Sequence, residues 1–144
     1  MLVQQILKSK ATDGVITLTV DATLSEAAAL LSSKKIGTIV VSNDGKSADG
    51  ILSERDIVRE LGRRGAGCMT DKLEDVMTKK LVTCTLTDRV DDILQSMTDG
   101  RFRHMPVLEN GELVGLISIG DVVKAKLAEL SMEKDALQGM IMGH

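Results

Sequence analysis

A duplication inside the 144-residue chain constrains its fold more than any other feature of the sequence. The segment VITLTVDATLSEA (residues 15–27) aligns without a gap with LVTCTLTDRVDDI (residues 81–93), so that Thr17 matches Thr83. The lead-ins VQQILK and LEDVMT, which precede these segments, also resemble each other. The chain is therefore expected to fold as two copies of one small unit.

The duplication continues through a second pair of segments. IVVSNDGKSADGILSERDIV (residues 39–58) aligns with MPVLENGELVGLISIGDVV (residues 105–123), with one extra residue in the first turn. The match includes the turn glycines and a Gly-h-h-Ser-x-x-Asp motif in each copy, where h is apolar. Its polar pairs are Ser53 with Ser118 and Asp56 with Asp121.

Each copy predicts the order β-α-β-β-α. A short strand precedes a helix with apolar residues three and four apart, and two strands joined by a Gly turn precede a second helix. In the first copy we expect strands at 15–20, 38–41 and 50–52 and helices from 24 and over 54–61. In the second copy we expect strands at 81–86, 105–108 and 113–117 and helices from 90 and over 120–130. A unit of about 60 residues is marginal alone, so the two copies should share a core.

The predicted fold class is α/β, with two β-α-β-β-α repeats related by a pseudo-two-fold axis and an extended C-terminal helix. The expected domains are a first repeat over 1–66, a linker over 67–72, a second repeat over 73–130 and a helical tail over 131–144. Leu127, Leu130, Leu137 and Ile141 recur at helical spacing towards the end of the chain. This tail either folds back on its own chain or meets a second copy; we favour the second copy and hence a homodimer.

The composition argues against nucleic acids and membranes as partners. A net charge of −3 does not favour a DNA-backbone-binding face, and one Phe with no Trp or Tyr leaves no stacking platform for single strands. No apolar run approaches the roughly 18–20 residues of a membrane span. The N-terminus lacks the pattern of a secretory signal, so the cytoplasm is the expected compartment.

The sequence gives little support for a catalytic site or a metal site. Two cysteines and two histidines show no metal-ligand spacing, and no nucleophile–base set can be assembled around the only internal histidine, His104. We therefore expect no enzyme, no metal and no catalytic cofactor. Cys68, in the Gly-rich stretch GRRGAGCMTD, is expected to be an exposed thiol, and Cys84 a core residue.

These segments resemble a tandem pair of cystathionine β-synthase (CBS) domains, the arrangement called a Bateman module. The resemblance rests on GILSERDIVRELGRRG (50–65) and RFRHMPVLENGELVGLISIGDVVKA (101–125), and extends over about residues 1–130. Its most specific feature is the duplicated Gly-h-h-Ser-x-x-Asp. Within the family the chain is similar to stand-alone bacterial pairs with no enzyme or transporter attached. The resemblance implies binding of an adenine nucleotide (AMP, ADP, ATP, NAD(H) or S-adenosylmethionine) in the cleft between repeats.

The resemblance also assigns roles to residues. It implies that Asp56 and Asp121 hold ribose hydroxyls, and that Ser53 and Ser118 lie near phosphate. The residues implied to line adenine are Val15, Ile16, Thr17, Thr38, Ile39, Leu81, Val82, Thr83, Met105 and Pro106.

The chemistry of the Ser-x-x-Asp motif supports two interpretations. At a strand-to-helix junction the free N–H groups and partial positive charge of the helix suit a phosphate, and a carboxylate can accept from both ribose hydroxyls. The same spacing is also a helix-capping pattern. Because the motif occurs twice at equivalent places we favour nucleotide binding, and a cap and a ligand site can coexist.

The two copies differ in charge. The first carries Glu54 and Arg55 where the second has Ile119 and Gly120. Before its second strand the second copy has Arg101, Arg103 and His104 where the first has Lys35, Gly37 and Thr38. We expect this basic stretch to face the phosphates of the nucleotide held by Asp56; the alternative is a solvated loop. The predicted phosphate-binding residues are thus Ser53, Arg55, Ser118, Arg101, Arg103 and His104. The asymmetry predicts two sites of different affinity or ligand.

The function expected is a regulatory module that senses energy or redox state through AMP, ATP or NAD(H) and signals to an unidentified protein. One alternative is a nucleic-acid or protein adaptor that senses no ligand; its nucleic-acid form would use a basic helical patch of Arg55, Arg59, Arg63 and Arg64. A nucleotide-hydrolysing enzyme is the other, and no nucleophile supports it.

Overall fold

The computed structural model describes residues 1–10 and 14–141. Residues 142–144 of the predicted tail and residues 11–13 of the first repeat lie outside the described residues. The chain divides into two compact units, each assembled from separate segments. One unit contains 14–83 and 106–116, and the other contains 1–13, 84–105 and 117–144.

The unit built on residues 14–83 carries the first repeat. Strand β1 (Thr17–Leu18) pairs in parallel with β2 (Thr38–Val41), and β2 pairs antiparallel with β3 (Gly50–Ser53). Between and after the strands lie α2 (Leu24–Lys34), α3 (Glu54–Arg64), the 3-10 helix η1 (Ala66–Thr70) and α4 (Leu73–Val76). The predicted elements of this repeat are confirmed, except that β1 is shorter than expected.

Local sequence explains where these helices begin and end. Thr23 caps α2, because its side chain accepts a hydrogen bond from the N–H of Glu26. Gly65, at φ 72°, ends α3 in a backbone conformation that a side chain would strain. All four residues of β2 are buried, and Ile39 and Val41 pack with Leu52 of β3 in the core of this unit.

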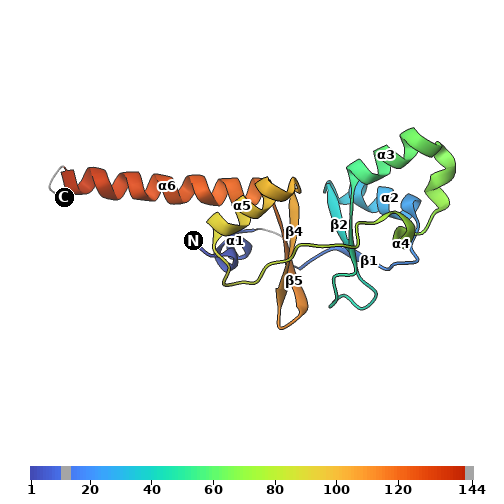
Figure 1. Cartoon of the computed structure of the whole chain (residues 1–144), viewed down its shortest axis with the longest axis horizontal. Coiled ribbons are helices and arrows are strands. Elements are labelled where there is room, and N and C mark those ends of the chain that lie inside the picture. The colour runs from blue at the N-terminus through green and yellow to red at the C-terminus, as the bar shows by residue number, and fades with distance from the viewer. Residues whose placement is uncertain (11–13, 142–144) are drawn as a thin grey trace. The chain divides into compact units, whose positions relative to one another are not determined.

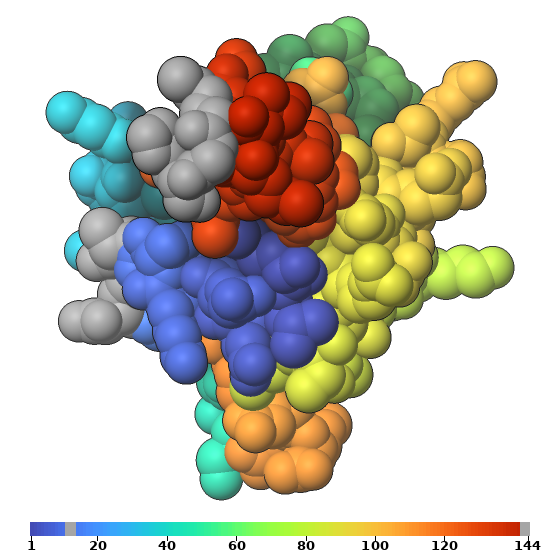
Figure 2. All heavy atoms as spheres, turned by 90° about the vertical axis from the view of Figure 1, so that its left-hand side faces the viewer, coloured from blue at the N-terminus to red at the C-terminus, as the bar shows by residue number. Residues whose placement is uncertain are grey.

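The second unit contains α1 (Val3–Ser9), α5 (Val90–Gly100) and α6 (Ile119–Ile141). The views in Figures 1 and 2 show the N-terminal residues beside α5 and α6. Strands β4 (His104–Glu109) and β5 (Glu112–Ser118), of which residues 106–116 belong to the unit of the first repeat, form a two-stranded sheet. The positive φ angles of Asn110 and Gly111 make its tight turn.

The predicted strand over 81–86 is wrong. Within the described part of the chain this segment carries no strand, only a single bridge position at Cys84. Its end turns instead: the side chain of Asp88 accepts from the N–H of Thr85, and the carbonyl of Thr85 accepts from the N–H of Asp88. The carbonyl of Leu86 accepts a hydrogen bond from the N–H of Gln4, so this backbone bonds to α1 rather than to a neighbouring strand.

Each lead-in helix packs with the opposite repeat. The N–H of Val3 donates to the carbonyl of Asp88 at 2.9 Å, which joins α1 to the second repeat. In the same way the N–H of Leu73 donates to the carbonyl of Ala22 at 2.8 Å, which joins α4 to the first. The two copies thus exchange lead-ins, a connection that sequence similarity alone did not predict.

Candidate functional site

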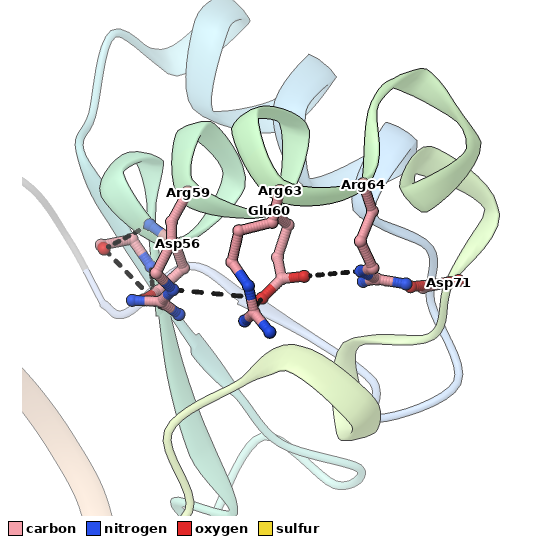
Figure 3. Close-up of polar contacts among 7 residues, drawn as sticks. Asp56, Arg59, Glu60, Arg63, Arg64 and Asp71 are labelled. Atoms are coloured by element: carbon pink, nitrogen blue, oxygen red, sulfur yellow. Dashed lines mark hydrogen bonds and ion pairs between the residues drawn. The ribbon is translucent and has the colours of Figure 1, made fainter.

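The first Ser-x-x-Asp motif lies where β3 turns into α3. Ser53 is the N-cap of α3: its hydroxyl accepts from the N–H of Asp56 at 3.3 Å, and its own N–H donates to Oδ2 of Asp56 at 2.9 Å. This reciprocal pair is a capping box. The structural alternative considered for the motif is therefore present, and it fixes the Asp56 side chain beside the start of the helix (Figure 3).

The second oxygen of Asp56 is also occupied. Oδ1 lies 3.0 Å from Nη2 of Arg59, one turn farther along α3. Asp56 is buried, with 8% of its surface exposed, whereas about half of the Arg59 side chain is exposed. A ligand hydroxyl that approaches Asp56 would therefore compete with an exposed arginine rather than with buried packing. The sequence placed Arg59 only in a basic helical patch and did not predict this contact.

The sheet brings several predicted residues to this motif. Thr38, at the start of β2, pairs directly with Ser53 at the end of β3, and the N–H of Glu54 donates to the carbonyl of Gly37 at 2.9 Å. Because β1 runs parallel to β2 with Thr17 opposite Val40, Val15 lies level with Thr38. Thr38 and Ile39 are buried, whereas Val15, Ile16 and Thr17 are partly exposed.

An open hollow of about 420 Å³ lies on the exposed side of α3. Glu54, Arg55, Val58 and Arg59 line it, so the arginine that covers Asp56 also reaches this hollow. Arg55 is exposed there.

The second motif, in the other unit, repeats the cap. The N–H of Ser118 donates to Oδ2 of Asp121 at 2.9 Å, and the N–H of Asp121 donates to the Ser118 hydroxyl at 3.1 Å. Here the cation comes from elsewhere in the chain, because Nζ of Lys10 lies 2.8 Å from Oδ2 of Asp121. Burial is the largest influence and would raise the pKa of Asp121, but Lys10 and the Ser118 N–H together hold it below its usual value.

Sequence reasoning did not predict the role of Lys10. A signal was present, since Lys10 and Lys80 follow the two lead-ins at the same distance. The structure gives them different places: Lys10 pairs with Asp121, whereas the cation at Asp56 is Arg59.

The basic stretch of the second repeat partly joins the second motif. The N–H of Ile119 donates to the carbonyl of Arg103 at 2.8 Å, which places the backbone of Arg103 beside the start of α6. His104 and Met105 begin β4, followed by the buried Pro106. Arg101 ends α5 at φ 55° and is exposed, as is Lys35 at the end of α2.

Three other predicted adenine contacts, Leu81, Val82 and Thr83, precede the buried Cys84 and lie in the first repeat's unit. Val82 and Thr83 are exposed, and Leu81 is partly exposed. Their backbone is thus accessible, but no strand orders it.

Glu60 organises the far end of α3. It is buried, and its carboxylate lies 3.5 Å from Arg63 and 2.8 Å from Arg64; Arg64 also pairs with Asp71 (Figure 3). With Arg59 on Asp56, three of the four arginines considered for a nucleic-acid patch are paired with acids of the same unit. The patch therefore has little net positive charge to offer a phosphate backbone.

Both cysteines are free and buried. The expectation of an exposed Cys68 is wrong: η1 turns this thiol into the core beside Leu73, leaving 1% of its surface exposed. Cys84 is a core residue as predicted, and burial followed by the charge of Asp88 raises its pKa to about 12. Neither thiol is poised for chemistry.

Two searches of residues 1–10 and 14–141 bear on other functions. No group of three or more His, Cys, Asp or Glu is placed to hold a metal ion. No helix in this part of the chain has the length and apolar character needed to cross a bilayer.

Comparison with known proteins defines the class. The family model for the CBS domain matches residues 3–63 and again 73–128. The chain belongs to the CBS domain family and carries a tandem pair of these domains.

Individual proteins of similar sequence or structure agree with this family assignment. The chain is 36% identical over 141 residues to the CBS domain-containing protein CBSX3, mitochondrial, of Arabidopsis thaliana, covering 94% of this chain and 68% of that protein. The crystal structure of the CBS-domain containing protein ATU1752 from Agrobacterium tumefaciens is 42% identical, with a TM-score of 0.81 over 88% of this chain and 99% of that one. The CBS domain protein PAE2072 from Pyrobaculum aerophilum, solved in complex with AMP, is 27% identical, with a TM-score of 0.76 over 92% of this chain and 99% of that one.

Proposed function

We propose that this protein is a regulatory module that binds an adenine nucleotide, AMP, ADP, ATP or NAD(H), in the cleft between its repeats and so senses energy or redox state in the cytoplasm. The observation that carries the proposal is the duplicated Ser-x-x-Asp capping box, which holds a carboxylate at a helix N-terminus in each repeat. The AMP complex of PAE2072 supports the ligand class.

In the proposed complex Asp56 and Asp121 accept the ribose hydroxyls, and Ser53 and Ser118 lie near phosphate. The bound nucleotide displaces Arg59 from Oδ1 of Asp56, while Oδ2 keeps its bond to the Ser53 N–H. The freed guanidinium can then pair with phosphate, whose oxygens suit its planar fork. The adenine contacts proposed are Val15, Ile16, Thr17, Thr38, Ile39, Leu81, Val82, Thr83, Met105 and Pro106.

The basic residues Arg101, Arg103 and His104 are proposed to bind the phosphates of the nucleotide held by Asp56, and Arg55 is a further proposed phosphate-binding residue. The nucleotide held by Asp121 has Lys10 as its cation. The two sites therefore differ in charge and are proposed to differ in affinity or in the nucleotide preferred.

Signalling requires that the nucleotide bind two states of the protein with different affinity. We propose that occupancy changes how the repeats or two copies of the chain sit together, and that a partner protein reads this change. No catalytic step is proposed. The protein works as a homodimer in this proposal.

The proposal is tested by thermal unfolding with AMP, ADP, ATP, NAD⁺, NADH and S-adenosylmethionine, followed by circular dichroism because the chain has no Trp or Tyr. A ligand at 100 times its dissociation constant stabilises the native state by roughly 2.7 kcal/mol. We expect a rise of several degrees with one adenine ligand, reduced in Asp56→Asn, which keeps an acceptor for the Ser53 N–H. No rise with any nucleotide for protein freed of bound ligand would contradict the proposal.

A further inference from the structure

The C-terminal half of α6 extends beyond the rest of its unit. The helix has 23 residues, and its described ion pairs with the unit end at Glu129, which contacts the N-terminal ammonium group. From Leu130 to Ile141 every residue except Gly139 is exposed. Figure 1 shows this half projecting past α1 and α5. An isolated helix of about twelve residues is marginal in water, so a contact outside the unit would stabilise this half of α6.

Most of the exposed apolar side chains of α6 form one regular stripe, and only Met132 and Met140 among its large exposed apolar residues lie off it. Moving along the helix, positions alternate four and three residues apart, which is the a/d spacing of a two-helix interface. Five of the six positions are apolar and are 41–84% exposed. The stripe consists of Val123, Leu127, Leu130, Lys134, Leu137 and Ile141.

We infer that this stripe binds the same stripe of a second copy of the chain, antiparallel, with the two-fold axis passing near Met132. In that register Leu127 packs against Leu137 of the second copy, and Val123 against Ile141 of the second copy. Lys134 falls opposite Leu130 of the second copy, where its aliphatic stem covers the leucine and its ammonium reaches water. This inference deepens the homodimer of the proposed function but does not depend on nucleotide binding.

Two observations select the antiparallel arrangement. In a parallel pair in register, Lys134 would meet Lys134 of the second copy in the same core layer, and like charges directly opposite are destabilising. In addition, α1 and α5 pack against the first half of α6, where Lys126 pairs with Asp91. A parallel pair would bring these two packed ends together, whereas the antiparallel pair sets them at opposite ends of the stripe.

The stripe is also long enough for a specific interface. At 1.5 Å per residue, α6 is about 34 Å long. Five apolar side chains and the lysine stem from each copy would bury on the order of 1,000 Å² in total, near the lower limit of a specific interface. A dimer with a dissociation constant in the micromolar range is expected.

The first experiment measures self-association of the full chain by sedimentation equilibrium. Leu137→Asp places a charge in the stripe, whereas Met132→Asp places the same charge on an equally exposed apolar residue of the same helix that points away from it. We expect Leu137→Asp to weaken the dimer by roughly a hundredfold or more, because two symmetric layers are lost, and Met132→Asp to change it less than about threefold. A monomeric wild type, or equal effects of the two variants, would overturn the inference.

The second experiment tests whether the two α6 helices run antiparallel or parallel. Because Cys68 and Cys84 are buried, a cysteine introduced on α6 is the reactive thiol towards a short bis-maleimide. We expect a mixture of Leu127→Cys and Leu137→Cys chains to cross-link and each variant alone to cross-link poorly, since like positions lie about 15 Å apart along the axis. Efficient cross-linking of each variant with itself would show a parallel pair and overturn the antiparallel register.

Discussion

The two repeats hold the same carboxylate in the same cap but neutralise it differently. Asp56 shares its charge with Arg59 of its own helix, an exposed side chain that reaches a hollow. Asp121 shares its charge with Lys10, from the other end of the chain. Local sequence determines the cap, whereas the cation that pairs with the carboxylate depends on which segment the fold places beside it. The repeats thus hold the same capped carboxylate in two electrostatic settings.

A second difference between the repeats lies one helical turn beyond the aspartate of the motif. Glu60 of α3 is buried beneath arginines, and its counterpart in α6 is Ala125, by the alignment that matches Asp56 with Asp121. The first repeat therefore relies on an ion-pair cluster where the second uses a small apolar residue. This difference should appear as different sensitivity to mutation.

The largest expected effect on stability comes from Glu60→Ala. Removing the buried carboxylate separates Arg63 and Arg64 from their shared partner and leaves a small void, so we expect a loss of about 1–2 kcal/mol in the free energy of unfolding. Urea unfolding followed by circular dichroism measures it.

The matched control for that prediction is Arg63→Ala. Its side chain is 68% exposed, so removing it should cost less than about 0.5 kcal/mol. Equal losses in the two variants would mean that the burial of Glu60 contributes nothing beyond a surface pair.

A smaller effect is expected from Lys10→Met, and it should depend on pH. The pKa of Asp121 is lowered from its ordinary 3.8, so its pairing stabilises the fold above that value and the contribution disappears as the pH falls through the lowered pKa. Unfolding by urea at pH 7 should show wild type more stable than Lys10→Met by up to about 1 kcal/mol.

Below about pH 4 that difference should shrink, because protonated Asp121 no longer attracts Lys10. Lys8→Met removes an exposed lysine of α1 and should show no such pH dependence. A gap between wild type and Lys10→Met that persists unchanged in acid would assign it to packing of the lysine stem instead.

The smallest effect compares the cations at the two motifs. Arg59→Ala removes the group that competes for Asp56, so adenosine, which has no phosphate for Arg59 to bind, should bind two- to fivefold more tightly. Lys124→Ala, the equivalent change in the second repeat, should leave adenosine binding unchanged because Asp121 pairs with Lys10. Calorimetric titration compares them; weaker binding to Arg59→Ala would show that Arg59 orders the site rather than competing for it.

Much of the fold was predictable from short-range pattern. The duplication and the spacing of apolar residues predicted elements that the structure contains, among them α2 and β2. The segment 81–86 was mispredicted because strand propensity does not provide a pairing partner, and its backbone bonds go to a turn and to α1. The exchange of lead-in helices between the repeats was missed for a related reason. Sequence similarity shows that two segments are alike, but it does not show with which repeat each segment packs.

For the site, the sequence predicted the motif but not its contacts. Ser53 and Asp56 are three apart at a strand–helix junction, so their mutual bonds follow from local geometry. Lys10 and Asp121 are separated by 111 residues, and only the folded chain places them together. Cys68 was misplaced because glycines around it suggested an open linker, whereas η1 packs it into the core.

Calorimetric titration of AMP into nucleotide-free protein tests the central claim most directly. The account predicts that wild type binds AMP, that Asp56→Ala and Asp121→Ala each weaken one site by about a hundredfold, since charged hydrogen bonds contribute roughly 1.5–3 kcal/mol each, and that the double variant binds none while its circular dichroism is unchanged. Equal binding of AMP by wild type and the folded double variant would contradict it.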